Sequence, residues 1–157
     1  MVIIRDDLVG KNYREIPTML NYETHVKKDS MFNTPPVFSV FVVNETLKWL
    51  DSLGGLEAMS VINERKTGKL YTEIEMNSLF RSPVNVEDRS FMNIPFVFSD
   101  NCMDDNHFLK FCDKRGLNSL KGHRSVGGFR ASIYNAMPEA GVEALISAMQ
   151  EYKKSIL

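Results

Sequence analysis

The stretch Lys121-Gly-His-Arg-Ser-Val-Gly-Gly-Phe-Arg-Ala-Ser-Ile-Tyr-Asn135 joins a glycine bend to cationic side chains and a short apolar alternation. Its two adjacent glycines permit the positive φ angles and the close backbone approach that a tight bend requires. We expect this bend to bring His123, Arg124 and Arg130 together. Because a guanidinium group presents paired donors to a carboxylate or a phosphate, the grouping predicts a site for a doubly acidic small ligand. A plain hairpin with two solvated arginines is the alternative, and the residue pattern leaves both open.

Apolar runs on both sides of the bend predict a mostly antiparallel sheet. Residues 117–120 and 129–134 are expected to form two strands that the glycine loop connects. Another strand is predicted at residues 93–99, where large apolar side chains alternate with other residues. A shorter strand is expected at residues 80–84.

Apolar residues at helical spacing predict four helices, at residues 38–53, 56–76, 104–115 and 138–154. The first follows a proline pair, which a helix tolerates in its first turn, and it stops at two glycines. From residue 80 onward the order of elements predicts an α+β layer in which helices cover the sheet.

The chain opens with a segment that predicts a buried strand. Val2, Ile3 and Ile4 form a short β-branched run bounded by charge, which is typical of a strand with neighbours on both sides. Nothing in this sequence precedes it, so we expect it to be the end of a larger sheet. Residues 10–36 are rich in turn formers and predict an extended arm that crosses a surface.

Composition excludes several classes of partner. The chain has 157 residues, is 43% hydrophobic and 25% charged, and carries a formal net charge of -1. Nucleic acid or an anionic membrane as the main partner calls for a basic excess. Two cysteines and three widely separated histidines match neither a disulfide framework nor a zinc-ligand spacing. Without a membrane-spanning apolar run or a signal pattern, the chain is predicted to be cytoplasmic, with both cysteines reduced and apolar.

A second candidate site precedes the first long helix. Asn33 and Thr34, within Ser30-Met-Phe-Asn-Thr-Pro-Pro36, offer an amide and a hydroxyl just before that helix begins. Free backbone N–H groups and the positive end of the helix dipole favour a phosphate at such a position. Because Asn and Thr are ordinary N-cap residues, the simpler interpretation is that they only cap the helix.

Four motifs taken together resemble phosphoserine aminotransferase. They are the Ser30–Pro36 segment, the long Gly122–Pro138 segment, Asp88-Arg-Ser90 with Met92-Asn93, and Ile16-Pro-Thr-Met-Leu-Asn-Tyr22. The resemblance extends from about Val2 to Lys154. It implies a pyridoxal-phosphate enzyme of the aspartate-aminotransferase fold type, classed as α/β to α+β. Residues 1–36 would be the end of the large domain and a cofactor-contacting arm, and residues 37–157 the connecting helices and the small domain with its mostly antiparallel sheet.

The resemblance also implies a reaction and roles for the candidate residues. That family transfers an amino group between L-glutamate and 3-phosphohydroxypyruvate in serine biosynthesis. Arg130 would grip the α-carboxylate of the amino-acid substrate, while His123 and Arg124 would bind the substrate phosphate or the distal carboxylate of glutamate. Asn33 and Thr34 would reach from one subunit to the phosphate of pyridoxal 5'-phosphate in the other, so that a homodimer shares its active sites.

The chain departs from the family pattern in length. The lysine that forms the Schiff base belongs to the part of the family's sequence that precedes Met1, as do the aspartate and the aromatic residue that contact the cofactor ring. Lys11, Lys27 and Lys28 do not lie in the family's lysine context. No catalytic residue is therefore expected here, and the chain alone is predicted to be inactive. The alternatives are a free-standing domain that binds anionic metabolites without catalysis, and a truncated product whose first strand pairs with another copy.

Overall fold

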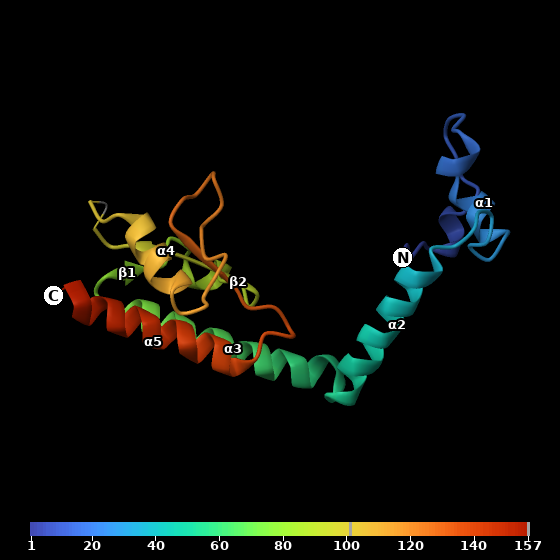
Figure 1. Cartoon of the computed structure of the whole chain (residues 1–157). Helices are drawn as coiled ribbons and strands as arrows, with labels where there is room; N and C mark the ends of the chain where they lie inside the picture. Colours follow the sequence, from blue (N-terminus) through green and yellow to red (C-terminus); the bar gives the residue numbers. More distant parts are fainter. Residues whose placement is uncertain (101, 157) are drawn as a thin grey trace. The chain divides into compact units, whose positions relative to one another are not determined.

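The computed structural model describes residues 1–100 and 102–156 and separates into two compact units, Met1–Trp49 and Leu50–Leu157 (Figure 1). The first unit holds η1 (Asp6–Leu8), η2 (Thr18–Leu20), α1 (Tyr22–Val26) and most of α2 (Val37–Ser52). The second holds α3 (Gly55–Met76), β1 (Phe80–Arg81), η3 (Val86–Asp88), β2 (Asn93–Phe98), α4 (Asp105–Asp113), β3 (Phe129–Ser132) and α5 (Glu139–Ile156).

The strand predicted at residues 2–4 is wrong. These residues belong to no strand, and the side chains of Val2 and Ile3 are exposed. An extended segment becomes a strand only when a neighbour completes its backbone hydrogen bonds, and the described residues provide none for it. The arm that follows is also more ordered than predicted, because Asn21 caps α1 by accepting a hydrogen bond from the Glu23 N–H at 3.1 Å.

α2 confirms the first predicted helix but leaves its apolar face uncovered. None of its residues is buried, and the Phe38 side chain is 77% exposed. Helical spacing of apolar residues sets where a helix forms, while burial depends on what packs against it. Within the described ranges, no helix has the length and apolar character needed to cross a membrane.

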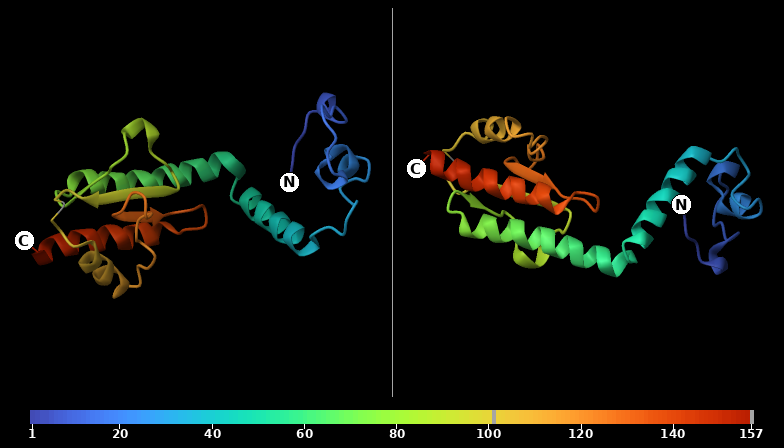
Figure 2. Two further views of the ribbon diagram at one scale, coloured as in Figure 1. Left: turned by 90° about the horizontal axis from the view of Figure 1, so that it is seen from above. Right: turned by 60° about the horizontal axis from the view of Figure 1, so that its bottom comes forward.

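A three-stranded antiparallel sheet in the order β1-β2-β3 forms the centre of the second unit. Phe80 pairs with Phe98, and Phe96 pairs with Phe129, so the four phenylalanines share one face of the sheet. α3 and α5 lie side by side along this face, and α4 packs against α5 (Figures 1 and 2). The predicted α+β arrangement is confirmed for this unit.

Aromatic rings fill the space between the sheet and the helices. Phe108 of α4 has its ring centroid 4.9 Å from those of both Phe129 and Tyr152, and 5.1 Å from that of Phe80. Phe96 and Phe108 are fully buried. The alternation predicted for residues 93–99 is confirmed, because Ile94, Phe96 and Phe98 point into this core.

The strand predicted at residues 117–120 is wrong. Among residues 117–121, all of which the structure describes, only Lys121 forms a β-bridge, to Phe129. The Leu120 carbonyl accepts a hydrogen bond from the Arg130 N–H at 2.7 Å. Ser119 interrupts the segment with a φ of 63°, a left-handed conformation that a strand cannot contain. The connection thus runs beside β3 without joining the sheet as a strand.

The two cysteines have different environments. Cys112 is buried, as predicted, whereas Cys102 is exposed, and neither forms a disulfide. Burial raises the pKa of the Cys112 thiol from 9.0 to about 12, with Arg115 lowering it and Asp113 raising it further. The folded chain therefore keeps this thiol protonated at pH values where the unfolded chain loses the proton.

This difference predicts a loss of stability in alkali. The stability that comes from keeping the Cys112 thiol protonated is fully present below pH 9. Between pH 9 and 12 the free energy of unfolding should fall by about 1.4 kcal/mol per pH unit, because only the unfolded chain loses this proton. Urea unfolding followed by circular dichroism from pH 8 to 11 measures it. Cys112→Ala should remove this part of the slope, and Cys102→Ala should retain it. Equal slopes for the two variants would contradict the assignment.

Candidate acid-binding site

The face of the sheet opposite the phenylalanines is the base of the candidate site. Arg130 pairs with Pro95 and Ser132 with Asn93, and all four are half-buried rather than enclosed. The Ser132 hydroxyl donates to Asn93 Oδ1 at 3.0 Å. Because side chains alternate along a strand, burying Phe129 and Ala131 in the core directs Arg130 and Ser132 to this outer face.

The glycine loop folds back onto the same sheet. Its neck is closed by the Gly122 N–H, which donates to the Gly128 carbonyl at 2.8 Å. Gly127 and Gly128 have φ angles of 74° and 61°, as the predicted bend requires. A Cβ on Gly128 would lie 2.5 Å from Val97 Cγ1, so the loop backbone is closely packed on β2.

His123 is constrained within the loop, whereas Arg124 is free of such contacts. His123 Nδ1 lies 2.7 Å from Ser125 Oγ, and the His123 carbonyl accepts hydrogen bonds from the backbone N–H groups of Val126 and Gly127. Both His123 and Arg124 are exposed. Over the described ranges, the Arg124 guanidinium has neither a hydrogen bond nor an ion pair, which leaves its donors available to a ligand.

Arg130 has an unmatched donor. Its Nε is buried and finds no hydrogen-bond partner in the part of the chain that the structure describes. The residue also lines a hollow of about 420 Å³ between residues 116–120, β3 and the start of α5. A buried N–H without an acceptor costs free energy, and an acidic ligand would relieve that cost.

The structure places these three residues on one strand and its adjoining loop but does not link them directly. No hydrogen bond or ion pair joins His123, Arg124 and Arg130 to one another among residues 1–100 and 102–156. Their shared acid-binding role therefore remains a prediction.

Asn33 and Thr34 belong to the other unit and are both exposed. Asn33 Nδ2 contacts Met19 Sδ at 3.5 Å, a weak hydrogen bond. Within the described part of the chain, neither side chain bonds to a backbone N–H of α2, which begins at Val37. Simple helix capping is therefore not what these two side chains do.

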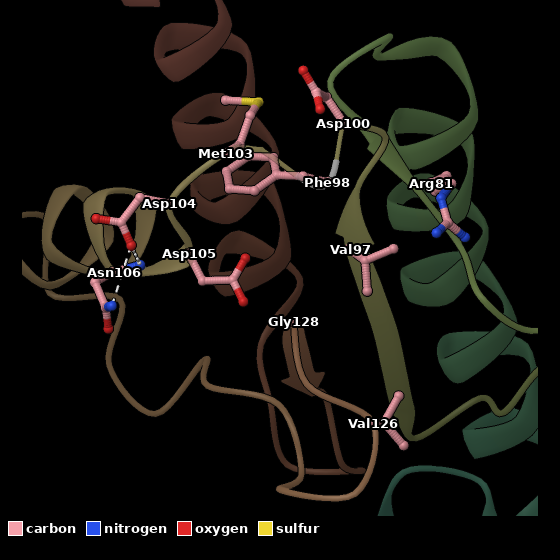
Figure 3. Close-up of a pocket in the computed structure, with 10 residues that line it drawn as sticks. All are labelled: Arg81, Val97, Phe98, Asp100, Met103, Asp104, Asp105, Asn106, Val126 and Gly128. Atoms are coloured by element: carbon pink, nitrogen blue, oxygen red, sulfur yellow. Dashed lines mark hydrogen bonds between the residues drawn. The ribbon is translucent and has the colours of Figure 1, made fainter.

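A separate hollow beside the loop is unsuited to an anion. It encloses about 480 Å³, and Figure 3 shows Asp105 directed into it, with Asp100 and Asp104 at its edge. Asp104 accepts a hydrogen bond from the Asn106 N–H at 2.9 Å and so caps α4. Among the residues that line this hollow, Arg81 is a single cation against three carboxylates, so a phosphate or a second carboxylate would meet a net negative charge. The surface around Arg130 is therefore the acid-binding candidate.

Comparisons with known proteins now identify the class. Residues 3–145 match the family Aminotransferase class-V, and the chain belongs to this family. Within it, the resemblance predicted from the four motifs is confirmed: the chain is similar to the C-terminal portion of phosphoserine aminotransferase. It is 50% identical to the enzyme of Parabacteroides distasonis and 51% identical to that of Phocaeicola vulgatus, over 98% of this chain in both cases.

Solved structures agree with the sequence relatives. The phosphoserine aminotransferase of Bacillus circulans subsp. alkalophilus superimposes with a TM-score of 0.90 at 43% identity, covering 98% of this chain and 43% of that one. That of Trichomonas vaginalis, with pyridoxal phosphate bound, gives a TM-score of 0.85 at 41% identity and covers 94% of this chain and 42% of that one. The chain spans 44% of the length of the two bacterial relatives.

The loop geometry predicts unequal effects of two glycine substitutions. Gly122→Ala should destabilise the second unit by about 2–3 kcal/mol, because its Cβ would collide with the Gly127 carbonyl oxygen and force the backbone to shift. Gly127→Ala should cost only about 1 kcal/mol, since it has a positive φ but no atom within 4 Å of the added carbon. Urea unfolding of both variants measures the difference, and equal losses would show that the neck is not closed as described.

Proposed function

We propose that this chain supplies the acid-binding and cofactor-contacting portion of a phosphoserine aminotransferase, which transfers an amino group between L-glutamate and 3-phosphohydroxypyruvate. The observation that carries the proposal is similarity over 98% of the chain to enzymes of that name. The candidate residues agree with it, because both substrates of this reaction carry two acidic groups.

Arg130 binds the α-carboxylate of the amino-acid substrate. Its guanidinium presents paired donors that match a carboxylate, and its unmatched Nε–H provides a donor for a carboxylate oxygen. His123 and Arg124, on the exposed loop, bind the second acidic group, which is the phosphate of phosphoserine or the distal carboxylate of glutamate. Together they orient the substrate, which is the contribution that positioned cationic groups make to catalysis.

Asn33 and Thr34 contact the phosphate of pyridoxal 5'-phosphate. Exposed amide and hydroxyl donors that are not used in capping α2 fit the phosphate oxygens of this cofactor. When bound, the cofactor supplies the electron-withdrawing ring that amino transfer requires. In a homodimer these two residues would serve the active site of the partner subunit, which makes each site a shared one.

The chain carries no catalytic residue of its own in this proposal. The lysine that would hold the cofactor covalently lies in the family's sequence upstream of the region represented here. Lys27 is engaged by Glu23 at 2.8 Å, and Lys66 is enclosed in the second unit. Alone, the chain binds acidic ligands and does not transfer amino groups.

Reconstitution tests this function. The chain would be co-expressed with the segment of the Parabacteroides distasonis enzyme that precedes its similar region, and 2-oxoglutarate formation from glutamate and 3-phosphohydroxypyruvate would be assayed. We expect turnover from the pair and none from the chain alone. The same split made within the Parabacteroides enzyme is the matched control.

Each other outcome has a definite meaning. Turnover by the chain alone would contradict its predicted inactivity. An inactive pair beside an active control would contradict the aminotransferase role and favour an acid-binding domain without catalysis. That second candidate is supported by one observation: His123, Arg124 and Arg130 all lie in the compact unit Leu50–Leu157.

Arg130→Gln should weaken binding of O-phospho-L-serine to the isolated chain. The loss of a charge-assisted hydrogen bond, about 1.5–3 kcal/mol, corresponds to a roughly tenfold to hundredfold higher Kd by isothermal titration. Arg115→Gln is the matched control, because it removes the same charge from a residue that pairs with Glu151 at 2.9 Å. Equal affinities for the two variants would exclude Arg130 from the site.

A further inference from the structure

Lys66, on α3, is a buried charge without a carboxylate partner. Its side chain is 0% exposed, and it takes part in none of the ion pairs found between described residues. Burying a lone ammonium group is costly unless hydrogen bonds satisfy it. Its neighbours must therefore supply that compensation.

Three backbone carbonyls surround the ammonium group. Lys66 Nζ donates to the carbonyl oxygens of Tyr134 at 3.0 Å, Met137 at 3.1 Å and Asn135 at 3.4 Å. An ammonium has three donors and no acceptor, so this set matches its full capacity. All three carbonyls belong to the turn between β3 and α5. The turn is thus folded around a cation that α3 provides.

The nearby Glu139 carboxylate does not take the place of the three carbonyls as the partner of the Lys66 ammonium group. Burial lowers the pKa of Lys66, and the Glu139 carboxylate at the start of α5 raises it in opposition. Glu139 is bound by Arg65 at 2.9 Å and by Lys69 at 2.7 Å. The carbonyls of the turn are therefore the direct partners of the Lys66 ammonium.

The turn continues directly from the strand that carries Arg130. Asn63, one helical turn before Lys66, donates to Asn135 Oδ1 at 2.9 Å and holds the same segment. The Ile133 N–H donates to the Met92 carbonyl at 2.8 Å, which ties the end of β3 to the residue before β2. A displaced turn would pull on this end of the strand, which lies two residues beyond Arg130.

We propose that Lys66 is a positioning residue of the acid-binding site: its ammonium group organises the turn at Tyr134–Met137 and thereby fixes the strand that carries Arg130. The inference rests on the proposed role of Arg130 in binding an acidic substrate. Lys66 itself touches no ligand. It acts through the three carbonyls and the backbone that connects them to β3.

Lys66→Met in the 157-residue chain separates positioning from packing. Methionine fills much of the space but donates no hydrogen bond, so the apolar packing is largely kept while the three carbonyls of the turn lose their donor. We expect the far-ultraviolet circular dichroism spectrum to be retained. The Kd for O-phospho-L-serine should rise on the order of tenfold, because residues that share a hydrogen-bond network are energetically coupled.

Chemical rescue tests the ammonium group itself and serves where the methionine variant fails to fold. Lys66→Ala removes three methylene groups and the ammonium, a space that n-propylammonium can fill. 1-Propanol has nearly the same size but no charge and a single donor. We expect n-propylammonium to restore ligand affinity to the alanine variant, 1-propanol not to restore it, and neither compound to affect the unsubstituted chain.

The outcomes distinguish this inference from the proposed function. Unchanged affinity of Lys66→Met, or equal rescue by both compounds, would overturn the positioning role while leaving the acid site intact. If the unsubstituted chain does not bind O-phospho-L-serine, the acid site proposed for it is wrong, and Lys66 has no site to position.

Discussion

Burial of one face of the sheet is the constraint on which the rest of this structure depends. Phe80, Phe96, Phe98 and Phe129 pack on that face, and each contributes on the order of 2–3 kcal/mol by leaving water. A slip of one residue in any strand would turn its phenylalanine outward, so the pairing register is strongly determined. The same register places Arg130 on the opposite face, because neighbouring residues of a strand point in opposite directions.

Polar interactions refine this arrangement. The ion pairs of Arg65 and Lys69 with Glu139 lie at the surface, where solvent screening and the entropy of long side chains make such pairs weak. Lys66 is different because it is enclosed, so its hydrogen bonds to the turn carbonyls cannot be exchanged for water without cost. Apolar burial thus holds α3 and α5 to the sheet, and a buried cation specifies the connection between β3 and α5.

The candidate acid site uses two kinds of support. Arg130 is carried by a paired strand, whereas His123 and Arg124 are carried by a loop that is closed at Gly122 and packed at Gly128. A strand gives a guanidinium a defined direction, and an exposed loop lets its side chains adjust to ligands of different length. This division suits the proposed binding of acidic ligands that differ in length.

The sequence by itself determined the family, the four predicted helices and the alternating strand at Ile94–Phe98, because these depend on local spacing and on motifs of adjacent residues. It also determined the loop conformation at Gly127 and Gly128, since positive φ angles at adjacent positions favour glycine. Only the tertiary structure decided that residues 2–4 form no strand, because strand formation requires a partner. It also decided that residues 117–120 form none, because Ser119 adopts a left-handed conformation beside β3. It alone showed that Lys66, in a helix with many charged residues, meets carbonyls about seventy residues away in the chain, since a helical pattern does not specify which segment covers each face.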